Sequence, residues 1–244
     1  MRMDLNCDVG ELPEALANGT QEAILRQVTS ANIACGAHAG DLQMMRATIE
    51  QALRCGTAIG AHPGYEDRAN FGRIALALSS EEVAASVYRQ IVALAEIAER
   101  CGARIGHVKP HGALYNQAAR DREIARAIAE GVARWRRDVV LVGLAESVML
   151  EEFRTAGFAV AAEGFADRTY EADGSLRARK FRDALLHDPA EAAAQAVRIA
   201  REGSVVAANG AVIPLDVETI CIHGDTPGAP QIAAAVRRAL EDAG

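Results

Sequence analysis

The sequence predicts an α/β fold, a single seven-stranded (β/α) barrel that is TIM-like but distorted. The first observation is the length of 244 residues, close to the roughly 250 residues that one such barrel needs. The second is that short apolar runs alternate with helical patterns, the order typical of βαβ units around a parallel sheet. The third is that half of the residues are hydrophobic and no linker or low-complexity stretch divides residues 1–244, so we expect one domain.

Seven apolar runs are the expected barrel strands. They are short and bounded by turn residues, as buried parallel strands are. Their ranges are 3–9, 31–35, 57–61, 104–109, 138–143, 157–162 and 219–222. Seven units of this kind predict a closed or nearly closed barrel.

Helices are predicted between the strands from periodicity and capping residues. Asp41 is expected to cap a helix that carries Leu42, Met45, Ile49 and Leu53 on one face and ends before Gly56. Ser79 with Glu82 predicts a capping box for a long helix ending at Gly102. Further helices are expected around 124–135, after Asp188-Pro189, and around 232–240.

Two segments interrupt this alternation. Residues 204–214 read as a β-hairpin insertion, with Asn209-Gly210 predicting a type I′ turn before the last barrel strand. Residues 163–187 are rich in charge and contain Asp173-Gly174, which predicts a long loop over the barrel mouth. Loops of this length are usually functional or mobile.

Charge and cysteine usage exclude several classes of protein. The net charge is −7 with no basic cluster, so we expect no nucleic-acid partner. The longest apolar run, 139–150, is too short for a membrane span and contains Glu146. The first residues lead directly into a predicted strand and do not match a secretory signal. Five cysteines without regular spacing predict reduced thiols and a cytoplasmic location.

Titratable side chains follow most of the predicted strands. In a barrel, the carboxyl ends of all strands and the loops after them meet at one mouth, so residues far apart in the sequence can share one pocket. In the first strand, Asn6 and Asp8 share one face, and Glu11 follows it. Polar groups on an otherwise apolar strand are either a functional site or a buried hydrogen-bonded pair, and we favour the site.

His38 and His62 lie in stretches of small residues, where a ligand can approach the backbone closely. The alternative for His38 is a ring held by a backbone carbonyl. Asp41 is expected to be a helix cap and not a catalyst. Arg73 follows Phe71-Gly72 and brings a cation towards the mouth, unless it forms an ordinary surface ion pair.

The densest cluster is His107, Lys109 and His111. Lysine among histidines at a barrel mouth polarises a carbonyl or holds a phosphoryl oxygen, and histidine exchanges protons near neutral pH. His107 is the weakest member and is expected to orient a neighbour. Asp167-Arg168 and His223 with Asp225 complete the candidate set.

Several chemistries lack a sequence motif. Residues 1–244 contain no G-x-S-x-G, H-E-x-x-H or G-x-x-x-x-G-K-[ST] motif. The sequence therefore gives no support for a serine esterase, a zincin metalloprotease or a P-loop protein. Cys7, Cys35 and Cys221 are expected to be small apolar filler. A divalent metal held by His and Asp in a deacetylase-like way stays open, because spacing alone does not separate ligands from acid and base groups.

Six segments together resemble the LamB/YcsF family, in the right order and over essentially the whole chain. They are 4–11 (DLNCDVGE), 30–41 (SANIACGAHAGD), 60–64 (GAHPG), 107–115 (HVKPHGALY), 165–168 (FADR) and 220–225 (ICIHGD). One stretch departs from the family pattern: residues 179–184 read RKFRDA, where the family usually shows Arg-Ser-x-Pro-Gly-Ala.

The resemblance implies a seven-stranded barrel related to the glycoside hydrolase/deacetylase barrels. It also implies an ATP-dependent 5-oxoprolinase activity, which opens the lactam 5-oxoproline to L-glutamate. The chain would be the A subunit of that enzyme, beside partner subunits B and C. ATP would be the co-substrate, and we expect any divalent metal to be Mg²⁺ bound with it.

On that reading, Asp8, His38, Lys109 and His111 are the expected catalytic residues. Asp8 or His111 would be the base that activates water, and Lys109 and His38 would stabilise the developing oxyanion or phosphate. The expected substrate-binding residues are Asn6, Glu11, His62, Arg73, Asp167, Arg168, His223 and Asp225. Two alternatives stay open: a metal-dependent deacetylase or amidohydrolase without ATP, and a non-catalytic protein that only binds a ligand for its partners.

Overall fold

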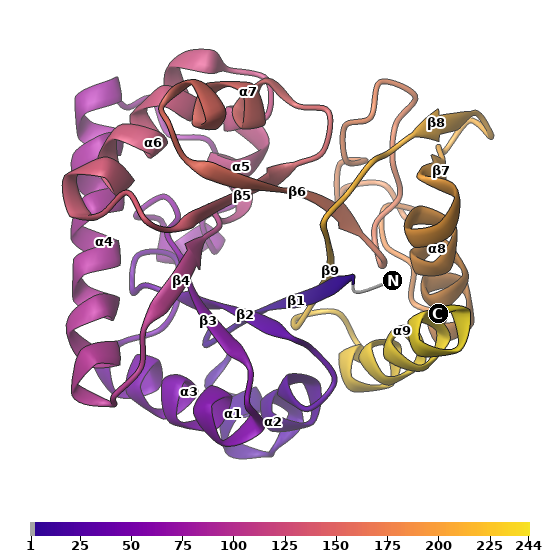
Figure 1. Cartoon of the computed structure of the whole chain (residues 1–244), viewed down its shortest axis with the longest axis horizontal. Coiled ribbons are helices and arrows are strands. Elements are labelled where there is room, and N and C mark those ends of the chain that lie inside the picture. The colour runs from indigo at the N-terminus through magenta and orange to yellow at the C-terminus, as the bar shows by residue number, and fades with distance from the viewer. Residues whose placement is uncertain (1–2) are drawn as a thin grey trace.

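The computed structural model describes residues 3–244 and contains a closed barrel of seven parallel strands. The strands form a ring with helices around it (Figure 1). They are β1 (Asp4–Val9), β2 (Ser30–Ala34), β3 (Ala58–His62), β4 (Ile105–Val108), β5 (Val140–Leu144), β6 (Ala159–Phe165) and β9 (Thr219–His223), in that order around the ring. The predicted fold class is confirmed, and each strand overlaps its predicted run.

The two faces of the barrel strands differ in chemistry. Residues alternate along a strand, so Leu5, Cys7 and Val9 face the surrounding helices and are buried there in the apolar core. Asn6 and Asp8 have the opposite parity and hydrogen-bond to other strands across the barrel. The apolar core therefore lies between strands and helices, while the interior near the mouth is polar.

Register brings the polar positions to one level. Asp8 is paired with Asn32 on one side and with His223 on the other. Asn32 is paired in turn with Gly60, and Gly60 with His107. Five strands thus place these residues in one layer below the mouth.

The helices pack outside the barrel. Their bounds are α1 (Pro13–Ala17), α2 (Thr20–Leu25), α3 (Leu42–Cys55), α4 (Ser80–Arg100), α5 (Gly112–Ala118), α6 (Arg122–Trp135), α7 (Val148–Thr155), α8 (Pro189–Glu202) and α9 (Ala229–Ala243), with a 3₁₀ turn η1 (Arg68–Asn70). The short helices α1, α2, α5 and α7 were not predicted, because five to eight residues are too few to show a clear period.

The predicted caps are confirmed. The Asp41 carboxylate accepts a hydrogen bond from the Met44 backbone N–H at 2.8 Å, and Gly56 ends α3 with φ 70°. Ser79 and Glu82 form the capping box of α4.

The predicted inner face of α3 is partly wrong. Met45 and Ile49 are buried, but Leu42 is 67% exposed and Leu53 is 43% exposed. Met44, Thr48 and Ala52 are buried in addition. The buried stripe is therefore rotated away from the two leucines, which lie in the first and last turns of α3.

The hairpin at residues 204–214 is present, but its turn differs from the prediction. Strands β7 (Ser204–Val206) and β8 (Val212–Pro214) pair antiparallel. Only Gly210 of the Asn209-Gly210 pair has a positive φ, whereas a type I′ turn requires positive φ at both central residues. The Gly210 N–H donates to the Ala207 carbonyl and the Ala207 N–H to Ala211, so the loop is longer than two residues.

The segment after β6 also differs from the expected loop 163–187. Strand β6 continues to Phe165, so Glu163 is a barrel residue with no exposed surface. From Ala166 to Asp188 the chain forms an irregular segment, pinned by isolated bridges such as Arg168 to Leu185. In residues 3–244, no helix combines the length and apolar character needed to cross a membrane.

Candidate active site

A cavity of about 430 Å³ opens at the carboxyl ends of the strands. Nine of the twelve candidate residues line it: Asp8, Glu11, His62, Arg73, Lys109, His111, Arg168, His223 and Asp225. The other three, Asn6, His38 and Asp167, are buried behind that wall. Side chains from distant parts of the sequence therefore meet at one mouth, as the barrel topology requires.

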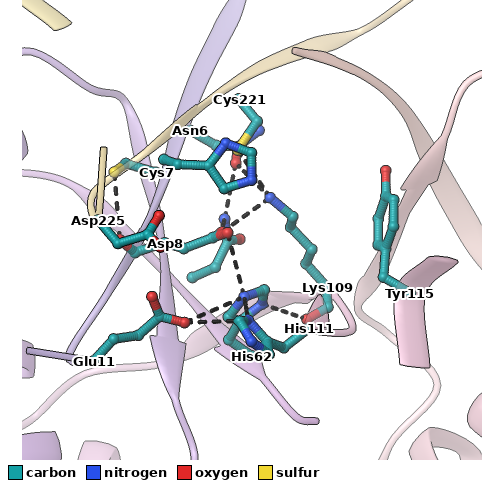
Figure 2. Close-up of polar contacts among 12 residues, drawn as sticks. Asn6, Cys7, Asp8, Glu11, His62, Lys109, His111, Tyr115, Cys221 and Asp225 are labelled. Carbon is teal, nitrogen blue, oxygen red and sulfur yellow. Dashed lines mark hydrogen bonds and ion pairs between the residues drawn. The ribbon is translucent and has the colours of Figure 1, made fainter. Parts of the chain in front are cut away.

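Lys109 lies at the centre of this site, directed inward among residues of other strands (Figure 2). Its Nζ is 2.9 Å from Asp8 Oδ1, 2.8 Å from Glu163 Oε1, 3.0 Å from Cys221 Sγ and 3.3 Å from Asn6 Oδ1. An ammonium has three N–H donors, so these four acceptors already saturate it. Burial lowers the pKa of Lys109, but Asp8, Cys221 and Glu163 outweigh it and raise the pKa above its usual value. Lys109 is therefore charged.

Asp8 is held in one orientation by two donors. Its Oδ1 accepts from Lys109 and, at 2.9 Å, from the Asn32 side-chain amide, while Oδ2 lies 3.4 Å from His62 Nε2. Burial raises the pKa of Asp8, but His62 and Lys109 together lower it well below its usual range. The result is an ionised carboxylate on the cavity wall.

Asn32, in the same layer as Asp8, is itself held by two further groups. Its amide also donates to Asn6 Oδ1 at 2.8 Å, and its Oδ1 accepts from His107 Nε2 at 2.9 Å. The ring of His107 occupies the space above Gly60, where a Cβ would lie 2.1 Å from Nε2. His107 thus orients a neighbour and does not line the cavity.

Glu11 lies among three histidines. Its Oε1 is 2.9 Å from His38 Nε2, 3.2 Å from His111 Nδ1 and 3.9 Å from His62 Nε2. The rings of His38 and His111 are stacked, with centroids 3.7 Å apart and planes 3° apart. Figure 2 shows Glu11 directed at His62 and His111. Burial raises the pKa of Glu11, but hydrogen bonds from His111 and His38 outweigh burial and hold the pKa well below its usual value.

Backbone carbonyls fix the tautomers of two of these rings. His62 Nδ1 donates to the Lys109 carbonyl at 2.8 Å, and His111 Nε2 donates to the Phe71 carbonyl at 2.9 Å. Since a carbonyl only accepts, these two nitrogens carry N–H groups, and the other nitrogen of each ring is directed into the cluster. Those nitrogens, His62 Nε2 and His111 Nδ1, face each other at 3.0 Å. The pKa of His38 is lowered to about 4 by burial, so its ring is neutral at pH 7.

The opposite side of the mouth holds an aspartate–histidine pair. Asp167 Oδ1 lies 2.9 Å from His223 Nδ1, and its Oδ2 accepts from the hydroxyl of Thr226 at 3.1 Å. The ring of His223 stacks on Phe165. Asp167 is fully buried, so it holds His223 and has no access to the cavity.

The predicted arginines occupy two different environments. Arg168 donates to the Ala184 and Arg177 carbonyls and so holds the loop above the barrel. Arg73 forms an ion pair with Asp225, and Arg179 Nη1 lies 3.4 Å from the same carboxylate. Arg73 and Arg179 are both partly exposed at the cavity, where a ligand anion can reach them.

The buried cysteines are not activated. Cys7, Cys35 and Cys221 are buried, and burial raises the pKa of each thiol, to about 12 for Cys35. Protonated thiols are poor nucleophiles, in agreement with the expectation of small apolar filler. Cys221 is the exception in one respect, since its sulfur contacts Lys109.

Four site residues were not predicted from the sequence. Glu163, Asn32 and Tyr115 belong to the buried network, with the Tyr115 hydroxyl donating to Glu163 Oε2 at 2.7 Å. Arg179 lies in the stretch that departs from the family pattern. A signal for Glu163 and Asn32 existed: each is a polar residue within an apolar strand, the same pattern that identified Asn6 and Asp8.

The fold and site define an α/β barrel with a polar, charged mouth. The chain belongs to the LamB/YcsF family, whose model matches residues 3–244. It is 51% identical over 244 residues to the 5-oxoprolinase A subunit of Chloroflexus aggregans, a match that covers 100% of this chain and 97% of that protein. It is 48% identical over 239 residues to the 5-oxoprolinase A subunit of Bordetella pertussis, covering 98% and 95% of the two chains.

A solved structure shows the same fold. The lactam utilization protein from Thermus thermophilus superimposes with a TM-score of 0.92 at 45% identity, covering 100% of this chain and 97% of that one.

Proposed function

We propose that this chain is the A subunit of an ATP-dependent 5-oxoprolinase and hydrolyses the lactam 5-oxoproline to L-glutamate with partner subunits B and C. The observation that carries the proposal is full-length similarity, near 50% identity, to proteins named as the A subunit of 5-oxoprolinase. The cavity suits a small substrate with a carboxylate, because several arginines and a lysine line it. The five free cysteines support a cytoplasmic location.

A lactam carbonyl is a stabilised amide, so opening the ring needs activation. In the proposed reaction the γ-phosphoryl group of ATP is transferred to the lactam oxygen, which forms an O–P bond and releases ADP. Water then adds to the activated carbon, and the adduct breaks its C–N bond to give an acyl phosphate. A second water hydrolyses the acyl phosphate to glutamate and phosphate.

Asp8 is the better candidate for the base that activates water. It lines the cavity, is ionised, and is held by Lys109 and Asn32. Both ring nitrogens of His111 are already engaged, one with Phe71 and one within the histidine cluster. A general base must reach the proton that it abstracts, and this requirement favours Asp8.

The contacts of Lys109 and His38 do not favour the role expected for them, which was to stabilise the developing oxyanion or phosphate. Four acceptors lie within 3.3 Å of the three N–H groups of Lys109, so an oxyanion binds it only by displacing one of them. His38 is buried behind His111 and outside the cavity lining. We therefore assign His38 a positioning role, holding Glu11 and the ring of His111.

Arg73 and Arg179 are proposed to anchor the substrate carboxylate. Their guanidinium groups share Asp225 at the cavity, so an incoming carboxylate competes with Asp225 for the same donors. Arginine binds carboxylates in bidentate fashion, which also orients the ring. Mg²⁺ is proposed to enter with ATP.

The test is reconstitution of the chain with its partner subunits, following glutamate release from 5-oxoproline with and without ATP. ATP-dependent release supports the proposal. Release without ATP would favour a metal-dependent amidohydrolase, for which the Glu11–histidine cluster is the supporting observation. If variants of Asp8 leave ATP cleavage by the partners intact and weaken only 5-oxoproline binding, the chain serves only to bind the ligand.

A further inference from the structure

We propose that Glu11, His62 and His111, with His38 as a fourth ligand, bind one transition-metal ion at the edge of the cavity. The relevant observation is convergence: one ligand atom from each of these four buried residues lies within 4.8 Å of all the others. This inference concerns binding of an ion by the chain alone and does not depend on the proposed reaction.

The separations fit a metal site. Glu11 Oε1, His62 Nε2 and His111 Nδ1 lie 3.0, 3.2 and 3.9 Å from one another. Tetrahedral ligands with bonds of roughly 2.1 Å stand about 3.4 Å apart. Small side-chain adjustments therefore bring these atoms to bonding distance around one ion.

The hydrogen bonds on the far side of the His62 and His111 rings also support a metal site. The N–H groups of His62 and His111 donate to the carbonyls of Lys109 and Phe71. Metal-binding histidines almost always donate their second N–H to a carbonyl or carboxylate, which fixes the tautomer and aims the lone pair at the ion. Here the second nitrogens, His62 Nε2 and His111 Nδ1, are directed at Glu11 Oε1, at 3.9 and 3.2 Å.

Electrostatics also favour a bound cation. The ammonium of Lys109 lies between Asp8 and Glu163, and Asp167 faces His223. Among the described residues, the ionic contacts of Glu11 are with imidazoles alone. Glu11 thus has no lysine or arginine in its ionic contacts among these residues, and a metal ion would supply a full positive charge to this buried carboxylate.

His38 supplies the second independent observation. Its side chain is completely buried, and Nδ1 has no hydrogen-bond partner within residues 3–244. Without an ion, His38 Nε2 donates to Glu11 Oε1 at 2.9 Å, so the lone pair of the neutral ring is on the unengaged Nδ1. Because no group holds Nδ1, the proton can move to it when an ion binds, which gives Nε2 a lone pair for the ion next to Glu11.

The ligand set selects the metal. Three imidazoles and one carboxylate suit Zn²⁺ and other late first-row ions, whereas Mg²⁺ prefers oxygen ligands and water. Glu11, His62 and His111 line the cavity but His38 does not, so ligand access is from the Asp8 and Lys109 side. A Lewis acid there would lie beside the carboxylate proposed as base.

The test uses the full chain, freed of metal with chelator and titrated with Zn²⁺ or Co²⁺ by calorimetry and absorption, with Mg²⁺ for comparison. We expect one equivalent of Zn²⁺ or Co²⁺, with Mg²⁺ at least 100-fold weaker. Glu11→Gln and His62→Gln should each weaken Zn²⁺ binding at least tenfold, whereas His187→Gln, at an exposed histidine, should not. No Zn²⁺ or Co²⁺ binding by the unmodified chain would overturn the proposal, as would unaltered affinity in the first two variants.

Crystals of the unmodified chain soaked in Zn²⁺ give a readout that does not depend on variants folding. An anomalous peak between Glu11, His62 and His111 supports the site, and strong peaks elsewhere with none at this position contradict it. Because neither measurement uses turnover, a failure here is distinguishable from failure of the 5-oxoprolinase proposal.

Discussion

Lys109 Nζ lies 2.8 Å from Glu163 Oε1, which connects the end of β4 to β6 across the intervening strand β5. Both side chains are almost completely buried. Glu163 also accepts from Asn6 at 2.9 Å and from Tyr115. This pair therefore fixes the ammonium between two carboxylates, Glu163 and Asp8, at the base of the cavity.

Removing the charge of Glu163 should destabilise the fold. Breaking a buried ion pair leaves the partner charge uncompensated, at a cost of about 3–5 kcal/mol. We expect Glu163→Gln to lose stability of that size in urea unfolding. Glu81→Gln is the control, because Glu81 pairs with Arg134 at the surface and should change stability far less. Equal losses in the two variants would contradict the buried pair.

Asp8→Asn should abolish most of the turnover of the reconstituted enzyme. An amide retains the shape but does not accept a proton from water, and loss of a general base costs about 10²–10⁴-fold in rate. Glutamate release from 5-oxoproline measures it, with Asp216→Asn, at an exposed aspartate, as the control. Turnover within twofold of the unmodified enzyme would exclude Asp8 as the base.

Arg73→Gln should raise KM for 5-oxoproline about tenfold with a smaller change in kcat, because loss of one charge-assisted contact weakens substrate and transition state alike. Arg89→Gln removes an arginine from a surface pair with Glu66 and should leave both constants unchanged. Steady-state kinetics in the reconstituted complex separates the two constants. A fall in kcat at constant KM would assign Arg73 to the chemical step instead.

Gly60→Ala should destabilise the barrel by about 3 kcal/mol through overpacking, since the new Cβ would displace the His107 ring from Asn32. Gly106→Ala, on the neighbouring strand, is the matched control: its Cβ would meet nothing closer than 3.9 Å. We expect the control to stay within about 1 kcal/mol of the parent. Denaturant unfolding of both variants checks this, and similar stabilities would show that His107 moves freely.

The stability of the protein should fall on acidification because of His107. Burial lowers the pKa of His107 to about 4, against an ordinary value of 6.5, so the unfolded chain binds the extra proton between these values. Stability from this group is present above pH 6.5 and is lost as pH falls towards 4. The slope is about 1.4 kcal/mol per pH unit. In His107→Gln, the free energy of unfolding should depend less steeply on pH, by the slope that one proton contributes. Denaturant unfolding in EDTA from pH 4 to 7 measures this slope, and equal slopes in the variant and the parent would contradict the prediction.

Local rules were enough to predict the barrel and most of the titratable side chains that surround its mouth. Apolar runs identified all seven strands, and the caps at Asp41 and Ser79 were read correctly from spacing alone. Topology then implied that polar residues after each strand would share a mouth, and nine of twelve candidates line one cavity. Glu163 was assigned to a loop, because the predicted strand was ended at residue 162, where apolar residues give way to polar ones. The pattern of residue types does not show that β6 continues to Phe165.

The sequence by itself determined the fold class and the end of the barrel at which chemistry can occur, because both follow from the alternation of residue types along the chain. Only the tertiary structure decided which groups touch. Register placed Asp8 beside Asn32, and barrel closure brought Lys109 against Glu163 and Glu11 against three histidines. Charge, proton position and any metal affinity depend on separations of a few ångströms between distant strands, and those separations are fixed only when the ring closes.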